Sequence, residues 1–133
     1  MVHKYDLRVR YSDTDQMQRL HHAAYVEYLE VVRIECLRSM GFSYDALEKS
    51  GYLLPVSKLQ VRYRQGARYD EVLSFETRVE VLSEIRLVFH SSILVADRLI
   101  ATAEVELACI DANGHRPRRM PEPLLRALEK GSV

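Results

Sequence analysis

The sequence of 133 residues has two cysteines, no net charge and no long apolar run. Cys36 and Cys109 fit no metal-binding spacing and lie among apolar neighbours, which is typical of buried free thiols in a reducing compartment. Equal numbers of acidic and basic residues leave no long-range field that favours nucleic acid. The apolar runs are too short to span a membrane, and residues 1–6 lack the apolar core of a signal peptide. We therefore expect a cytoplasmic protein with no nucleic-acid partner and no membrane span.

The length and the apolar content of 47% are those of an ordinary globular chain. The sequence shows no internal repeat, low-complexity tract or linker, so residues 1–133 are expected to form a single domain. A neutral protein has little charge-based protection against self-association. A homodimer or homotetramer is therefore expected.

Two helices and a strand are expected in the first half of the chain. Residues 4–11 alternate between apolar and polar side chains, which predicts a strand. Residues 23–40 repeat with helical periodicity and are followed by Gly41, a typical helix stop. Apolar residues extend beyond one stripe of this helix, so we expect it to be covered on most sides. A shorter helix is expected over residues 43–50.

After Pro55 the periodicity changes to two and stays there. Four further strands are expected, over residues 57–64, 73–81, 85–90 and 99–109. Their short connections require antiparallel neighbours, and a short helix is expected after Pro121 and Pro123. The predicted fold class is α+β, with a five-stranded antiparallel sheet wrapped around the long helix. An exposed edge strand would favour pairing with a second copy.

The densest group of reactive side chains lies between the first strand and the long helix. It comprises Asp13, Asp15, His21 and His22, with Glu30 further along the helix. Four interpretations compete: a catalytic carboxylate beside helix N-terminal amides, a divalent-metal site, ordinary turn and capping groups, and a ligand site without chemistry. Spacing alone favours the turn and capping interpretation, because Asp-x-Asp loops are common. The metal interpretation is the weaker one, because the expected ligand spacings are missing.

The same segment resembles a known family. The matching residues are Tyr11-Ser-Asp-Thr-Asp15, then His22, Tyr25, Tyr28, Glu30 and Arg33, followed by Tyr63 to Asp70 and by Arg119-Met-Pro121. The pattern is similar to the 4-hydroxybenzoyl-CoA thioesterase family of hotdog-fold proteins, and closest to the acyl-CoA thioesterase branch associated with tol-pal clusters. The resemblance covers nearly the whole chain. It implies a hotdog fold and hydrolysis of a short-chain or aromatic acyl-CoA thioester.

The resemblance also implies roles for individual residues. Asp15 would be the catalytic carboxylate, as a nucleophile or as a general base that activates water. The backbone N–H of His22 would stabilise the oxyanion, and its side chain would orient Asp15 or line the acyl pocket. Tyr25 is a candidate substrate-binding residue, and Glu30 an alternative catalytic carboxylate. The nearby Asp13 is expected to raise the pKa of one of the two aspartates.

Coenzyme A requires positive groups for its phosphates, and the chain has no glycine-rich phosphate loop. The candidates for these contacts are Arg86, Arg116, Arg118 and Arg119, which the resemblance implies would come partly from a neighbouring subunit. A solvated basic surface explains each of them equally well. The acyl-CoA would be the substrate, with no separate cofactor and no metal.

The chain departs from the family at three positions. Gln18 replaces a glycine, Arg19 replaces a small aliphatic residue, and Gly66 stands where proline is frequent. Glutamine tolerates few of the backbone conformations open to glycine. The departures at Gln18 and Arg19 motivate an alternative function, a non-catalytic module that binds acyl-CoA or an acyl carrier, and no function is inferred from Gly66. A hotdog dehydratase and a purely structural scaffold are less favoured, because the first requires a proline-rich motif that is missing and the second leaves the Asp-Thr-Asp motif unexplained.

Overall fold

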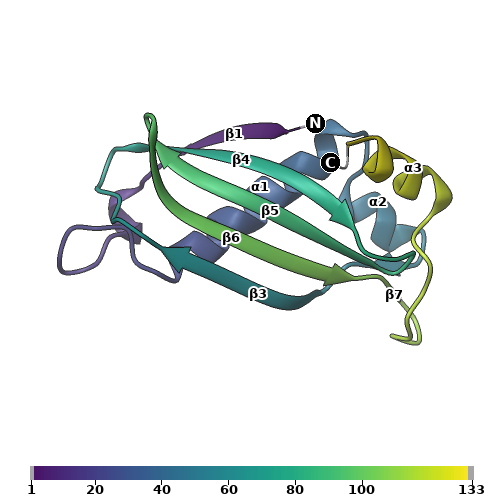
Figure 1. The fold of residues 1–133 in the computed structure, drawn as a ribbon. Helices are drawn as coiled ribbons and strands as arrows, with labels where there is room; N and C mark the ends of the chain where they lie inside the picture. The colour runs from purple at the N-terminus through teal and green to yellow at the C-terminus, as the bar shows by residue number, and fades with distance from the viewer. Residues whose placement is uncertain (1, 132–133) are drawn as a thin grey trace.

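The computed structural model describes residues 2–131 and shows one antiparallel sheet crossed by one long helix (Figure 1). The sheet has the strand order β1-β4-β5-β6-β3. Its strands are β1 (His3–Arg8), β3 (Val56–Tyr63), β4 (Val72–Val81), β5 (Arg86–Val95) and β6 (Arg98–Ala108). Helix α1 (Ala24–Ser39) runs diagonally across one face. This arrangement confirms the expected hotdog architecture.

The period-two pattern of the sequence determines which face of the sheet is buried. One row of directly paired residues crosses all five strands, from Tyr5 through Phe75, Ile93 and Ala101 to Tyr63. Phe75, Ile93 and Ala101 are fully buried against α1, because alternate residues of a strand point to the same face. The opposite face of the sheet carries charged and small polar side chains.

Helix α1 ends where the sequence predicts, with Gly41 at a φ of +93°, a conformation that glycine adopts without strain. Its buried stripe includes Tyr25, Leu29, Val32 and Cys36. The expectation that the helix is covered on most sides is wrong for one protomer. Val26 and Val31 are 38% and 39% exposed, because the sheet covers only one side of the helix.

Two short helices and a small ribbon close the end of the sheet opposite the β1–α1 connection (Figure 1). Helix α2 (Tyr44–Lys49) begins at Ser43, whose hydroxyl accepts from the Ala46 N–H. Its Tyr44 hydroxyl accepts from Nε of the buried Arg33 at 3.1 Å, which ties α2 to α1. Helix α3 (Glu122–Gly131) follows Pro121 as expected. Among the described residues, no helix is long and apolar enough to cross a membrane.

The structure differs from the predicted elements in three places. The first strand ends at Arg8, and the segment Tyr11–Asp13 forms a 3₁₀ turn. Strand β5 extends beyond the predicted residue 90 to Val95. Its polar Ser91 is buried, and the Ser91 hydroxyl is hydrogen-bonded to that of Thr77 at 2.8 Å. The ribbon of β2 (Tyr52–Leu53) and β7 (Ile110–Asp111) was not predicted, because a pair of two-residue strands has no periodicity to detect.

Candidate active site

The loop that carries Asp15 is a small hairpin rather than an irregular turn. Thr14 pairs with Leu20 as an antiparallel bridge, and the Asp15 N–H donates to the Arg19 carbonyl at 2.8 Å. Arg19 pairs in turn with Arg68, which follows strand β3. The hairpin is therefore attached to the β3–β4 connection as well as to α1. At its tip Gln18 has a φ of +61°, so the position usually occupied by glycine keeps a left-handed backbone in this chain.

One oxygen of the Asp15 carboxylate is held by the loop itself. Oδ1 accepts from the backbone N–H of Met17 at 2.8 Å and of Arg19 at 3.2 Å. Among residues 2–131, Oδ2 has no hydrogen-bond donor. Asp15 borders an open hollow of about 710 Å³, together with Tyr11, Met17 and His21. The carboxylate is therefore fixed through one oxygen, with the other available to a ligand in the hollow.

Asp13, two residues before Asp15, has a different environment. Its Oδ2 accepts from the Tyr28 hydroxyl at 2.6 Å and from Nε of Arg10 at 2.9 Å. Hydrogen bonds from Arg10 and from Tyr28 lower the pKa of Asp13. The expected rise in pKa of one aspartate is therefore not found at Asp13. This carboxylate ties the 3₁₀ turn to helix α1, which matches the turn and capping interpretation for Asp13 alone.

The two histidines occupy the entrance to helix α1. The His21 N–H donates to the Asp13 carbonyl at 2.8 Å, and the His21 ring nitrogen Nδ1 accepts from the Ala23 N–H at 3.1 Å. Nδ1 must be unprotonated to accept, so a neutral His21 carries its proton on Nε2. The His22 ring stacks on the His21 ring with a centroid distance of 4.3 Å. Within the described chain, the His22 ring makes no hydrogen bond to Asp15.

Helix α1 begins without a side-chain cap, because Ala23 occupies the capping position. The Ala24 N–H donates to the His21 carbonyl at 2.9 Å. The His22 N–H has no acceptor among residues 2–131. Free backbone N–H groups and the positive end of the helix dipole favour negative charge at such a place. Oδ2 of Asp15 and the His22 N–H are therefore both without a protein partner among residues 2–131. His21, the neighbour of His22 in the chain, borders the same hollow as Asp15.

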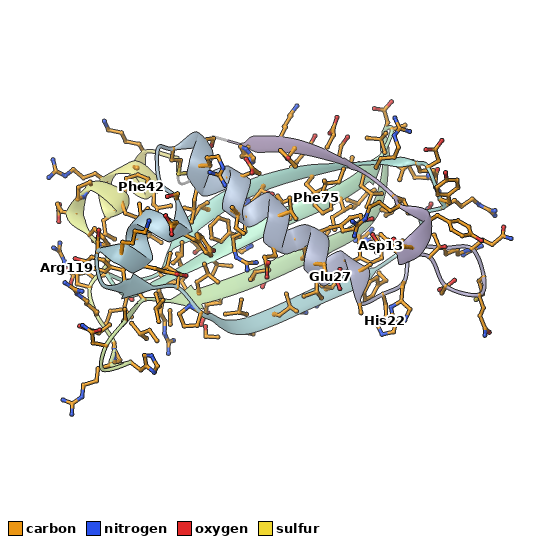
Figure 2. All side chains as sticks on the ribbon, turned by 180° about the vertical axis from the view of Figure 1, so that it is seen from behind. Asp13, His22, Glu27, Phe42, Phe75 and Arg119 are labelled. Carbon is orange, nitrogen blue, oxygen red and sulfur yellow. The ribbon has the colours of Figure 1, made fainter. Side chains whose placement is uncertain are left out.

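The other predicted site residues lie elsewhere. Tyr25 is buried, and burial raises its pKa; it is not among the residues that line the hollow. Glu30 is exposed on α1. Figure 2 shows Arg119 at one end of the protomer, and Asp13 and His22 at the other.

The predicted CoA-binding arginines have local partners at their own end. Arg118 donates to the Gly51 carbonyl at 2.9 Å and stacks over the Tyr52 ring. Arg119 forms ion pairs with Glu84 and Glu122. Arg86 begins strand β5 and is exposed. One protomer therefore does not bring Arg86, Arg118 and Arg119 together with Asp15.

Tyr63 contacts the entrance of helix α1, a role that the sequence analysis did not assign to it. Its hydroxyl donates to the His22 carbonyl at 2.8 Å, and its ring meets the buried Tyr25 ring edge-on at 5.0 Å. The two bonded residues are 41 positions apart. The alternation of β3 places Tyr63 on the helix side of the sheet, but it does not indicate which part of the helix the hydroxyl reaches.

Comparisons with known proteins agree with the fold. The family model of the thioesterase-like superfamily matches residues 9–128. The acyl-CoA thioester hydrolase YbgC of Escherichia coli O6:H1 is 34% identical over 123 residues, which are 92% of each chain.

Two solved structures are similar over most of their length. The DHNA-CoA thioesterase of Staphylococcus aureus has a TM-score of 0.91 and 31% identity, covering 97% of this chain and 89% of its own. The protein TT1821 of Thermus thermophilus has a TM-score of 0.90 and 34% identity, covering 96% of this chain and 98% of its own. The resemblance found in the sequence is confirmed. The chain belongs to the thioesterase-like superfamily and has the hotdog fold of a thioester hydrolase.

Proposed function

We propose that the protein hydrolyses a short-chain or aromatic acyl-CoA thioester, with Asp15 as its catalytic group. The observation that carries this proposal is the asymmetry of the Asp15 carboxylate. Two backbone amides hold Oδ1, and Oδ2 is left without a donor beside the hollow. In Asp13, by contrast, both oxygens accept side-chain hydrogen bonds, Oδ2 from Tyr28 and from Nε of Arg10, and Oδ1 from Nη2 of Arg10 at 3.4 Å.

The reaction breaks the bond between the carbonyl carbon and sulfur, and water supplies the new oxygen. In one route Asp15 attacks the carbonyl carbon, the thiolate leaves, and water hydrolyses the resulting anhydride. In the other route Asp15 takes a proton from water, which attacks the carbonyl carbon directly. In both routes negative charge develops on the carbonyl oxygen. One well-placed donor such as the His22 N–H is typically worth about 3 kcal/mol of transition-state stabilisation.

The proposed working form is a homodimer, or a dimer of dimers, joined through strand β3. This strand ends the sheet and pairs only with β6, so its outer edge is free within the described chain. Leu59 and Tyr63 on its helix-facing side are 41% and 48% exposed. Antiparallel pairing about a twofold axis would place the Tyr63 end of one copy beside the Val56 end of the other.

Such pairing would also bring together predicted site residues that lie far apart within one protomer. Strand β3 has eight residues and is about 26 Å long at 3.3 Å per residue. The twofold axis would bring the end of one copy that carries Arg118 and Arg119 toward the Asp15 hairpin of the other. We propose that these arginines contact the CoA phosphates across the dimer. Coenzyme A would enter as part of the substrate.

The test is thiol release from a panel of short-chain, long-chain and aromatic acyl-CoAs, with Asp15→Asn measured in parallel. Asparagine keeps an acceptor for the Met17 and Arg19 amides, whereas alanine would also release the loop. Turnover that disappears in Asp15→Asn while acyl-CoA binding persists would support the proposal. Binding without turnover by the wild-type protein would instead establish the non-catalytic module that Gln18 and Arg19 suggest.

A single turnover in ¹⁸O-labelled water would separate the two routes. Label found in the Asp15 carboxylate would exclude the route in which water attacks the thioester directly. Label confined to the released acid over repeated turnovers would exclude an anhydride that is hydrolysed at the Asp15 carbonyl carbon. Direct attack of water on the thioester, and hydrolysis of the anhydride at the acyl carbon, both place the label in the acid alone.

A further inference from the structure

The peptide unit between His22 and Ala23 is held at both of its polar ends by side chains. Its carbonyl accepts from the Tyr63 hydroxyl at 2.8 Å, and its N–H donates to Nδ1 of His21 at 3.1 Å. Tyr63 belongs to the edge strand β3, and His21 precedes the helix. Two separate parts of the fold therefore fix one peptide at the start of α1, where no side-chain cap is present.

The peptide on the other side of His22 is fixed as well. The His21 carbonyl accepts from the Ala24 N–H at 2.9 Å, so this carbonyl points toward the helix. In a trans peptide the N–H points opposite to the carbonyl. The His22 N–H, which belongs to this same peptide unit, therefore points away from the helix at its N-terminal end. Both dihedral angles of His22 are constrained by the bonds on its two sides.

We infer that Tyr63 and His21 are positioning residues that aim the His22 N–H at the thioester oxygen. This inference rests on the proposed function and adds two residues to it. The Tyr63 ring is itself held by its edge-on contact with the buried Tyr25. A donor displaced by about 1 Å can cost a large part of its effect on the rate. The bond from Tyr63 to His22 therefore links the edge strand to the geometry of the reaction.

The first variant is Tyr63→Phe, which removes the hydroxyl and keeps the ring against Tyr25. We expect kcat to fall about tenfold with KM within about twofold, as for a group that acts on the transition state alone. Tyr5→Phe is the matched control, because Tyr5 lies in the same cross-strand row but on the opposite edge strand. Its kcat should equal that of the wild type.

The second pair of variants tests the other end of the peptide. His21→Ala removes the acceptor for the Ala23 N–H and should lower kcat by a similar factor. His21→Asn places a side-chain oxygen near the position of Nδ1 and should restore most of the loss. Because His21 borders the hollow, its side chain could also contact the substrate directly. Loss of such a contact would raise KM in His21→Ala, and His21→Asn would not restore KM as it restores kcat.

Hydrogen exchange at the Ala23 amide gives a readout that does not depend on turnover. Tyr63→Phe should speed this exchange about tenfold, because the peptide loses one of its two anchors. An unchanged kcat in Tyr63→Phe, or a raised KM with unchanged kcat, would overturn the inference. If the wild type hydrolyses no thioester, the proposed function fails. Faster exchange of the Ala23 amide in Tyr63→Phe would then still show that Tyr63 holds the peptide between His22 and Ala23. Unchanged exchange would refute this structural role of Tyr63 as well.

Discussion

Arg19 and Gly66, two departures from the family pattern, are in contact in the structure. The stem of the Arg19 side chain lies over Gly66, and a Cβ added to Gly66 would lie 2.7 Å from Cδ of Arg19 and 3.2 Å from its Nη1. Ordinary contacts of a Cβ are at 3.4–4 Å, so any larger residue at position 66 requires Arg19 to move. In its observed position Arg19 leaves no room for a side chain at position 66, and the contact joins the Asp15 hairpin to the β3–β4 connection.

The prediction is a measurable coupling between Gly66→Ala and Arg19→Ala. With Arg19 absent, Gly66→Ala should stabilise the protein by about 0.4–1 kcal/mol, because alanine restricts the unfolded chain. With Arg19 present, displacement of its stem should cost a similar amount and leave Gly66→Ala near zero or slightly destabilising. The coupling free energy then equals this displacement cost, about 0.4–1 kcal/mol, against about 0.5–3 kcal/mol for residues in contact generally.

Urea denaturation of the wild type, both single variants and the double variant measures this coupling. Gly114→Ala is the matched control, since a Cβ at Gly114 meets nothing within 4 Å. Its effect should add to that of Arg19→Ala within about 0.3–0.5 kcal/mol, as for distant sites. If the effects of Gly66→Ala and Arg19→Ala add as closely as those of the control pair, the contact between Arg19 and Gly66 would be refuted.

Three further predictions concern Gln18 in the hairpin, the Asp13 carboxylate and the free edge of the sheet. Gln18→Gly should stabilise the protein by about 0.5 kcal/mol in urea denaturation, because relief of a left-handed non-glycine residue exceeds the entropy that glycine costs; a destabilised variant would contradict this. The pKa of Asp13 is lowered in the folded protein by Arg10 and Tyr28, so its stabilising contribution is present above the ordinary value of 3.8 and is lost as pH falls through the folded pKa. The stability of Asp13→Asn should therefore depend less on pH below about pH 5 than that of the wild type, and parallel pH profiles would exclude this role. Leu59→Lys on β3 should shift the molecular mass measured by light scattering toward the protomer, and an unchanged mass would argue against pairing through this edge.

Periodicity predicted most of the fold because the chain buries one face of a sheet and one side of a helix. It located α1 to within one residue at each end, and it identified every strand of the main sheet. It placed the end of β5 too early, because Ser91 and Ser92 interrupt the apolar pattern. In the structure β5 stays paired with β4 and β6 through Val95, and the hydrogen bond to Thr77 satisfies the buried Ser91 hydroxyl.

The candidate site was only partly predictable. The motif indicated Asp15 and His22, since the relevant residues are close in sequence. Spacing alone could not distinguish Asp13 from Asp15, because their different environments depend on donors from Tyr28 and Arg10 and from the hairpin amides. The contact of Tyr63 with His22 and that of Arg19 with Gly66 join residues more than forty positions apart, and no local pattern encodes them.

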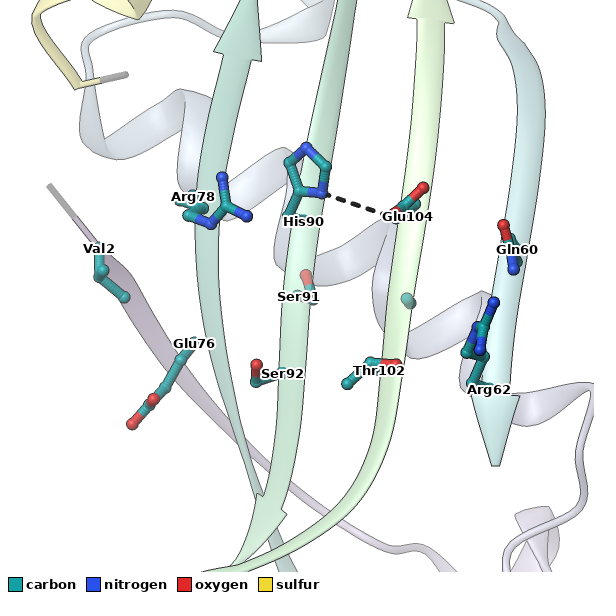
Figure 3. A pocket seen from close by; sticks show the side chains of 11 residues that line it. Val2, Gln60, Arg62, Glu76, Arg78, His90, Ser91, Ser92, Thr102 and Glu104 are labelled. Carbon is teal, nitrogen blue, oxygen red and sulfur yellow. Dashed lines mark ion pairs between the residues drawn. The ribbon is translucent and has the colours of Figure 1, made fainter. Parts of the chain in front are cut away.

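The outer face of the sheet provides a contrast with the site. A hollow of about 490 Å³ lies there, and among its lining residues Figure 3 shows His90 beside Glu104. Nε2 of His90 also lies 2.8 Å from Glu80. Three carboxylates of this face have side-chain partners, since Glu76 pairs with Lys4, and Glu80 and Glu104 lie beside His90. By contrast, Oδ2 of Asp15 has no donor among residues 2–131.

The most direct test of the account compares Asp15→Asn with Asp13→Asn in one assay of thioester hydrolysis and one of stability. Asp15→Asn should lose at least about 10³-fold in kcat, with a free energy of unfolding within about 0.5 kcal/mol of the wild type. Asp13→Asn should keep most of its kcat and lose stability, because Arg10 and Tyr28 lose their charged acceptor. Wild-type turnover by Asp15→Asn on a substrate that the protein hydrolyses would contradict the central claim.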